Sequence, residues 1–230
     1  QTDGPTSGTF DDRWAFTNRN PYLNYGTAIS LAAAARSLKE YNPQLSMEAS
    51  RVAQFIWKDE HSRPTPEKIE FGGRSFNSVD FMNSVECRAA FELWRTVGDT
   101  VYKNRMQKLF PILLTQFDRN VSVVARILPF MDNQIKKQVE PMVQAYVKQV
   151  TEQNKENPFG VQISRFSWAG NHGIVQEAIN AYQLHLLYPD IVKPDLIYRS
   201  LDYLFGCHPF HNLSFVSGVG AQPKKVAYGN

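Results

Sequence analysis

The sequence predicts an all-α domain in which helical hairpins form a toroid, with their loops gathered at one mouth. Three observations support this fold class. Apolar residues recur at helical spacing over most of the chain, the helical segments are separated by turns, and no pair of segments makes a convincing β-hairpin. The hairpins recur roughly every 40–50 residues, as in some helical repeat arrays. Because no residue pattern repeats and the loops are unequal, a toroid is favoured over a solenoid.

The first two helices are expected at residues 24–41 and 47–60. An alanine-rich run with high helix propensity marks the first of them. The dipeptide Asn42-Pro43 is expected to end that helix, and Ser46 is expected to cap the second. Residues 61–74, which hold two prolines and a Gly-Gly pair, are predicted to form a long loop.

The next hairpin is expected at residues 78–97 and 100–117. Gly98 is suited to end the first of these helices, and Asp99 is suited to cap the second. Pro111 is expected to kink or divide the second helix, because proline lacks the backbone N–H group that a helix interior requires.

Four further helices are expected, of which the first is shorter and the second begins at Asp132 or Asn133. They are predicted at residues 121–130, 132–153, 171–187 and 194–205. Pro141 is expected to introduce a second kink, and Pro194 fits a first helical position. Short strands are possible at residues 161–166 and 213–216.

Composition excludes several classes of protein. The 230 residues are 43% hydrophobic and 20% charged, close to globular averages of roughly 45–50% and ~25%, so a disordered chain is excluded. No apolar stretch approaches the ~20 residues of a membrane-spanning helix. The 25 basic and 22 acidic residues are scattered along the chain, so no nucleic-acid partner is predicted.

Sequence motifs of common enzyme classes are absent. The chain has no Gly-x-Ser-x-Gly elbow, no phosphate-binding loop and no dinucleotide fingerprint. Cys207, His208 and His211 could bind zinc with His172 as a fourth ligand. Their spacing is not that of a known structural zinc site, so ordinary loop hydrogen bonds are favoured. Neither a metal nor another cofactor is predicted.

A tryptophan and a glycine-rich segment stand out in the last third of the chain. Trp168 comes just before a helix that Asn171 could cap. It could pack on the helix start or form a flat platform at the mouth of a cleft. Glycines at 206, 218 and 220 allow sharp turns or close approach of the backbone to another molecule.

Several short stretches occur in an order that is found in one known family. Trp-Ala-Gly-Asn at 168–171 precedes Asp-Tyr-Leu-Phe-Gly at 202–206 and Ser-Phe-Val-Ser-Gly-Val-Gly at 214–220. Upstream are Glu-Leu-Trp-Arg-Thr-Val-Gly-Asp at 92–99 and Asn-Pro-Phe-Gly-Val at 157–161. Over roughly residues 78 to 220, this order resembles glycoside hydrolase family 9, the inverting endoglucanase family.

The resemblance implies an (α/α)₆ toroid with an open cleft for a β-glucan polysaccharide or oligosaccharide, present here as roughly its middle two-thirds. It implies substrate-binding roles for Trp168, Asn171, His208 and Tyr228, the last in place of a family histidine. Family members act outside the cytoplasm, so a secreted or periplasmic protein is expected, although this chain shows no signal peptide.

The resemblance also implies a single catalytic domain. The whole chain, residues 1–230, is expected to be part of it. Residues 1–20 would form an irregular lead-in, 21–205 the helical hairpins and 206–230 a cleft loop.

The chain departs from the family in its acid and base. It lacks the Asp-Ala-Gly-Asp stretch of the base and the His-His-Arg substrate motif, and the family's acid would lie beyond Asn230. Inverting hydrolysis needs two carboxyl groups ~6.5–9.5 Å apart. Glu86, Glu92, Glu177 and Asp202 are expected instead in exposed pairs or caps, so this chain alone is expected to be inactive.

Two other functions stay open from the sequence. The chain could be a non-catalytic carbohydrate-binding or scaffold protein on a degenerate toroid. It could also belong to an unrelated α/α-toroid enzyme such as a polysaccharide lyase or a sugar epimerase, for which His172 and Tyr228 are only loosely suited.

Overall fold

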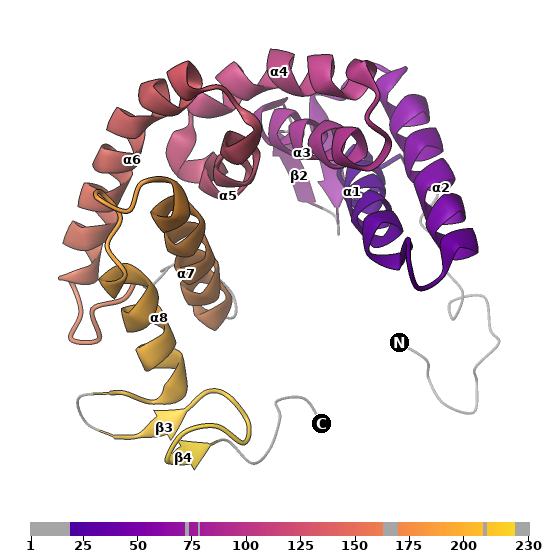
Figure 1. Ribbon diagram of the computed structural model, residues 1–230. Coiled ribbons are helices and arrows are strands. Elements are labelled where there is room, and N and C mark those ends of the chain that lie inside the picture. The colour runs from indigo at the N-terminus through magenta and orange to yellow at the C-terminus, as the bar shows by residue number, and fades with distance from the viewer. Residues whose placement is uncertain (1–18, 72–73, 78, 163–169, 209–210, 224–230) are drawn as a thin grey trace, which may run out of the picture. The chain divides into compact units, whose positions relative to one another are not determined.

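The computed structural model describes residues 19–71, 74–77, 79–162, 170–208 and 211–223 (Figure 1). Helices dominate these residues, and the strands among them form two short pairs. The predicted all-α fold class is therefore confirmed. The chain divides into two compact units, Gln1–Met106 and Gln107–Asn230.

The first unit is built on three helices, α1 (Pro21–Leu38), α2 (Pro43–His61) and α3 (Val79–Val97). Helix α1 packs against both α2 and α3. Its alanines, of which Ala28 and Ala32 are fully buried, face a cluster that includes Trp57, Leu93 and Tyr102. Small side chains on this face let the neighbouring helices approach closely.

Both α1 and α2 begin at an Asn-Pro pair. The side chain of Asn20 accepts a hydrogen bond from the backbone N–H of Leu23 at 3.2 Å, and Asn42 accepts one from Leu45 at 3.1 Å. The prediction that Asn42-Pro43 ends the first helix was therefore wrong. Asparagine satisfies a free N–H group of the first turn, and proline fits the first helical position because it has no N–H to satisfy.

Ser46, the predicted cap, lies inside α2 instead. Its hydroxyl group donates to the backbone oxygen of Ala35 at 2.7 Å. It therefore connects α2 to the last turn of α1.

The predicted loop over residues 61–74 contains a strand, which is a second correction. Strand β1 (Lys68–Phe71) pairs antiparallel with β2 (Arg74–Asn77). The sequence carried a partial signal, because polar and apolar residues alternate over Lys68–Phe71 before a Gly-Gly pair. This arrangement is typical of a two-residue hairpin.

Helix α4 (Thr100–Leu114) begins as predicted. Gly98 has a φ of 76° at the end of α3, and Asp99 accepts a hydrogen bond from Val101 N–H at 2.9 Å. The helix ends at Leu114, three residues after Pro111, rather than at 117. The N–H groups of Thr115 and Gln116 then bond three residues back, which tightens and closes the last turn.

The second unit contains α5 (Phe117–Ile127), the short η2 (Leu128–Phe130), α6 (Asn133–Asn154), α7 (Gly170–Leu187) and α8 (Asp195–Phe205). Helix α7 packs against α5 and α8. The core of this unit includes the fully buried Val124, Ile127, Val139, Val143 and Leu184.

The ends of the last three helices agree with the predicted ends within a few residues. Asp132 caps α6 by accepting from Ile135 N–H at 2.8 Å, which confirms its predicted role. Pro194 stands just before α8 rather than in its first position. Asn171 lies in the first turn of α7 and does not cap it, because the helix already includes Gly170.

Strand β3 (Leu213–Ser214) runs parallel to β4 (Gln222–Pro223) after α8. It is shorter than the predicted strand at 213–216. Of the strand predicted at 161–166, residues 161 and 162 are not in a strand, and the rest lies outside the described residues. No described helix is both long enough and apolar enough to span a bilayer.

Candidate functional site

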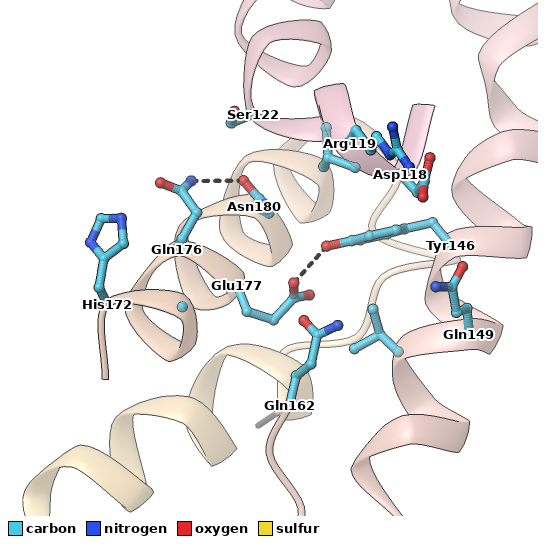
Figure 2. Close-up of a pocket in the computed structure, with 13 residues that line it drawn as sticks. Asp118, Arg119, Ser122, Tyr146, Gln149, Gln162, His172, Gln176, Glu177 and Asn180 are labelled. Atoms are coloured by element: carbon cyan, nitrogen blue, oxygen red, sulfur yellow. Dashed lines mark hydrogen bonds between the residues drawn. The ribbon is translucent and has the colours of Figure 1, made fainter. Parts of the chain in front are cut away.

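Polar side chains converge in a pocket of the second unit, at the meeting of α5, α6 and α7. The pocket has a volume of about 360 Å³. Its polar lining comes from all three helices and from the loop before α7 (Figure 2). These residues are Asp118, Arg119 and Ser122 of α5, Tyr146 and Gln149 of α6, Gln162 of the loop, and His172, Gln176, Glu177 and Asn180 of α7. We refer to it as the Glu177 pocket.

Glu177 is the buried acid of this pocket. It lies on the apolar face of α7, at helical spacing from Ile174, Ala181 and Leu184, and only 6% of its surface is exposed. The hydroxyl group of Tyr146, itself buried, donates to Glu177 Oε2 at 2.6 Å. Figure 2 shows the two side chains pointing toward one another from α7 and α6.

Burial shifts the pKa values of both members of this pair. It raises the pKa of the Glu177 carboxyl group, because a charge is poorly solvated there, while the hydrogen bond from Tyr146 acts in the opposite direction. Burial and the nearby Glu177 also raise the pKa of the Tyr146 hydroxyl group. Burial thus makes ionisation of Glu177 less favourable than it is in water.

The second oxygen of Glu177, Oε1, is completely buried. No hydrogen bond reaches the buried Oε1 atom from any residue that the structure describes. In Figure 2 the side chain of Gln162 points toward this carboxyl group. The Gln162 amide N–H₂ group donates to Gln153 Oε1 at 2.7 Å.

Two further amides of the pocket, on α7, are hydrogen bonded to each other. The side-chain nitrogen of Gln176 donates to Asn180 Oδ1 at 3.0 Å (Figure 2). His172 lies exposed in the first turn of α7, beside Asn171. Amide groups combine donors and acceptors in one side chain, so this lining suits a ligand that also does both.

The residues predicted from the resemblance fall into two places or lie outside the described part. Asn171 is half-buried and precedes His172, which lines the Glu177 pocket, but Asn171 itself is not part of the lining. His208 follows α8 and does not line that pocket. Trp168 and Tyr228 lie outside the described residues.

His208 is part of an aromatic cluster. Its ring centroid lies 5.5 Å from that of Phe159, 5.0 Å from Tyr203 and 5.4 Å from Phe215. The ring nitrogen Nε2 donates to the backbone oxygen of Tyr203 at 2.8 Å. These contacts fix the orientation of the imidazole, while Phe215 stays partly exposed.

The side chains that could have bound zinc are not arranged as metal ligands. His208 and His211 approach each other, with their Nδ1 atoms 3.3 Å apart, but Nε2 of His208 is already engaged by Tyr203. Throughout the described ranges, no three His, Cys, Asp or Glu side chains group closely enough to hold a metal ion.

The prediction that the helix-borne carboxylates are exposed was wrong for three of the four. Glu86 is 5% exposed, Glu92 is fully buried, and Glu177 is the pocket residue described above. Asp202 is exposed, as expected. Each of the three buried residues occupies a core-facing position of its helix, where an isolated charge would be costly.

The buried carboxylates of the first unit are paired with arginine. Glu86 accepts hydrogen bonds from Arg105 at 2.7 and 2.6 Å, and its Oε1 lies 2.8 Å from His61 Nδ1. Glu92 pairs with Arg36. The same holds for Glu60, a buried acid that sequence reasoning missed, which pairs with Arg19. Glu177 differs from all of them because its partner is a neutral phenol.

Tyr146 was also missed by sequence reasoning, as was the burial of Glu177. The available signal was an acid at the position in α7 where the apolar spacing expects a hydrophobic residue. Such a break in the pattern often marks a functional position.

Comparison with known proteins gives a consistent result. The sequence model of glycosyl hydrolase family 9 matches residues 5–228. No curated protein matches the chain in a direct sequence comparison.

Several solved endoglucanases have a similar fold. The cellulase Cel9M of C. cellulolyticum is 16% identical, with a TM-score of 0.70 over 90% of this chain and 48% of its own. A termite endoglucanase, from Nasutitermes takasagoensis, is 19% identical, with a TM-score of 0.68 over 89% of this chain and 48% of its own.

A thermostable endoglucanase from Alicyclobacillus acidocaldarius is 17% identical, with a TM-score of 0.63 over 90% of this chain and 41% of its own. This chain thus spans less than half the length of each of these three structures. At such low identity, the likeness supports the fold rather than the activity. Because the family model matches almost the whole sequence, the chain belongs to glycosyl hydrolase family 9.

Proposed function

We propose that the protein to which this chain belongs hydrolyses β-glycosidic bonds of β-glucans such as cellulose, xyloglucan or mixed-linkage glucan, with inversion. The observation that carries the proposal is the family match over residues 5–228. A structure of Cel9M in complex with cellobiose, and one of AaCel9A with a cellobiose-like isofagomine, support a β-glucan as the substrate.

In this proposal the chain supplies substrate-binding residues of a single catalytic domain that acts outside the cytoplasm. Trp168, Asn171, His208 and Tyr228 would contact the sugar. The cluster around His208 supports its role, because the partly exposed Phe215 beside it gives an apolar surface for the C–H face of a pyranose ring. The oriented imidazole would add a polar contact, as ligand sites generally require.

The acid and the base would come from other parts of the protein. The buried acids Glu60, Glu86 and Glu92 are each paired with arginine, and Glu177 is hydrogen bonded to Tyr146. Each of these carboxyl groups is therefore already engaged within the chain.

Assay of the complete protein tests the proposal. It should release reducing sugar from β-glucans, and proton NMR during the first minutes should show the α-anomer as the initial product, as inversion requires. Binding of cello-oligosaccharides without turnover would favour the non-catalytic alternative. Release of an unsaturated sugar from a uronic-acid polysaccharide, with no action on β-glucans, would identify a lyase instead.

Replacing the predicted platform tests the binding residues. In the complete protein, Trp168→Ala should weaken cello-oligosaccharide binding by about 1–3 kcal/mol while the melting temperature is nearly retained. If Trp168 instead packs in the core, the variant should lose about 3–5 kcal/mol of stability, with unchanged affinity in the molecules that remain folded.

A further inference from the structure

The hydrogen bond between Tyr146 and Glu177 connects α6 to the first half of α7 (Figure 2). Another hydrogen bond, from the Tyr188 hydroxyl group to the backbone oxygen of Lys136 at 2.8 Å, connects the other end of α7 to the start of α6. The two bonds thus hold α7 against α6 at different points along its length.

The Glu177 carboxyl group lacks the partners that a buried charge requires. Tyr146 donates to Oε2, and no described residue donates to the completely buried Oε1. The other titratable or charged groups around the pocket are Asp118 and Arg119 of α5 and His172 of α7. These three side chains are exposed, so water screens their charges. Helix α8 also packs against α7, but none of its described residues lines the pocket.

Two opposing effects act on the ionised form of Glu177, and burial is the larger. The hydrogen bond from Tyr146 favours the carboxylate, whereas burial disfavours it, and the net result is a raised pKa of Glu177. One hydrogen bond from a neutral phenol does not compensate for the loss of hydration at both carboxylate oxygens. The ionised form is therefore stabilised by any rearrangement that gives Oε1 access to water.

The Glu177 pocket supplies the space for such a rearrangement. It offers about 360 Å³ beside the carboxyl group, whereas a water molecule takes up roughly 30 Å³ in the liquid. An ionised side chain that turns toward the pocket would be hydrated there, and Tyr146 would lose its acceptor. The first half of α7 would then be released from α6, while Tyr188 still holds the other end.

The released part of α7 includes a residue of the proposed function. Asn171, one of the proposed sugar contacts, lies in the first turn of α7, about two turns before Glu177. A continuous helix is stiff over this distance, because each turn is hydrogen bonded to the next. A displacement at Glu177 therefore moves Asn171 as well.

We propose that Glu177 is a positioning residue: its protonated carboxyl group holds the first half of α7 against α6 through Tyr146, and its ionisation releases α7 and weakens β-glucan binding. The protonated form predominates at acidic pH, so binding is strongest there and weakens as pH rises through the range in which Glu177 ionises. The effect on binding rests on the proposed function, whereas the change in α7 does not.

Hydrogen exchange of the complete protein tests the change in α7. The unmodified protein is compared with Glu177→Gln, whose amide cannot ionise but still accepts from Tyr146. At each pH, the exchange rate of the amides of residues 174–180 is divided by that of the variant, which cancels the intrinsic effect of pH on exchange. This ratio should rise by about fivefold or more between pH 4 and pH 8.

Enzyme kinetics on a soluble β-glucan test the effect on binding. The ratio of KM between the unmodified protein and Glu177→Gln should also rise by about fivefold or more from pH 4 to pH 8. The corresponding ratio of kcat should change less, because Glu177 acts on the position of a binding residue and takes no part in bond cleavage.

Tyr146→Phe removes the connection to α6 at every pH, so exchange in residues 174–180 and KM should both be raised already at pH 4. Tyr188→Phe is the matched control, because it removes a tyrosine hydrogen bond between α7 and α6 away from the pocket. It should keep the pH dependence of the unmodified protein. A circular dichroism melt of each variant shows that it is folded. If Glu177→Gln is unfolded, the comparison of Tyr146→Phe with Tyr188→Phe at pH 4 decides.

Three results would overturn the inference. The first is an exchange ratio that stays constant between pH 4 and pH 8, and the second is equal exchange at pH 4 in Tyr146→Phe and Tyr188→Phe. The third is hydrolysis of glucan with a KM ratio that does not depend on pH. A pH-dependent exchange ratio in a protein that hydrolyses no glucan would refute the proposed function alone. Hydrolysis with a constant exchange ratio would refute this inference alone.

Discussion

Glu86 and Glu177 are both buried carboxyl groups, but only Glu86 has a positively charged partner. Glu86 accepts two hydrogen bonds from the guanidinium group of Arg105, and His61 contacts the same carboxylate. Glu177 is hydrogen bonded to Tyr146, which cannot neutralise a negative charge. Burial therefore disfavours ionisation of Glu177, and this difference sets the pH dependence of its contribution to stability.

The residue-scale prediction concerns Glu177→Gln. Because burial raises the pKa of Glu177 above its unfolded value of about 4.5, the folded protein keeps a proton that the unfolded chain releases as pH rises. The free energy of unfolding should thus fall from about pH 4.5 up to the folded pKa. The glutamine variant lacks this loss. Its stability relative to the unmodified protein should rise over that interval and then level off.

Urea unfolding at several pH values between 4 and 8 measures this difference. Glu152→Gln is the control: Glu152 is exposed, and its pKa is lowered by a hydrogen bond from Lys155. Its relative stability should show no such rise with pH. A flat difference for Glu177→Gln would mean that Glu177 is solvated in the folded protein.

At the level of single elements, the ends of the helices are determined by a few residues. Asn20 and Asn42 begin α1 and α2 in the same way, and Asp132 begins α6. At the end of α8, Gly206 has a φ of 93°, a left-handed conformation that most residues avoid. It turns the chain toward β3, where Phe215 N–H then bonds to Leu204 O at 2.9 Å.

Gly206→Ala should destabilise the second unit by about 2 kcal/mol or more. A left-handed conformation alone costs an alanine about 1–2 kcal/mol. The added Cβ atom would also lie 2.8 Å from the Asn212 oxygen and 2.9 Å from the Ser214 nitrogen, both backbone atoms that cannot easily move.

The control for this prediction is Gly26→Ala. Gly26 lies within α1, and a Cβ atom there would meet nothing within 4 Å. That variant should gain about 0.5–1 kcal/mol, because alanine favours the helix interior. Urea unfolding measures the free energy of unfolding of both variants. An equal change in this free energy for Gly206→Ala and Gly26→Ala would show that the conformation of Gly206 does not constrain the residue.

At the scale of the whole molecule, α7 presents apolar side chains to solvent as well as to the core. Val175, Ile179, Tyr182 and Leu186 follow one another at helical spacing and are 40–64% exposed. We call them the α7 stripe. Contiguous exposed apolar surface of this kind promotes association.

The α7 stripe should make the 230-residue chain bind a hydrophobic dye in its folded state or associate as its concentration rises. Dye fluorescence and sedimentation velocity measure these two effects. Replacing Ile179 and Leu186 with lysine should reduce both without lowering the melting temperature by more than a few degrees, because neither side chain is buried. A monomeric, dye-negative unmodified chain would contradict the prediction.

The 230-residue chain by itself should not hydrolyse β-glucan. Its buried acids are engaged in the pairs described above, and general acid–base catalysis typically contributes 10²–10⁴-fold to the rate. Reducing-sugar release by the purified chain should equal that of a heat-inactivated sample, whereas the complete protein should be active. Activity of the chain above that control would show that an acid and a base lie within it.

Local interactions allowed much of the fold to be predicted. Helical spacing, alanine content and polar caps act within a few residues of each other, so the helices and the caps at Asp99 and Asp132 could be read from the sequence. The order of short stretches was sufficient for the family. Even the hairpin at β1 and β2, which was missed, had a local signal in its Gly-Gly pair.

The Glu177 pocket depends on tertiary structure instead. Glu177 and Tyr146 are 31 residues apart in the sequence, and nothing near either of them shows that they meet. The same is true of Glu92 and Arg36, which are 56 residues apart. The sequence alone determined an all-α member of its family. Tertiary packing decided which carboxyl groups are buried and what neutralises them, because solvation and charge pairing depend on which helix faces come together.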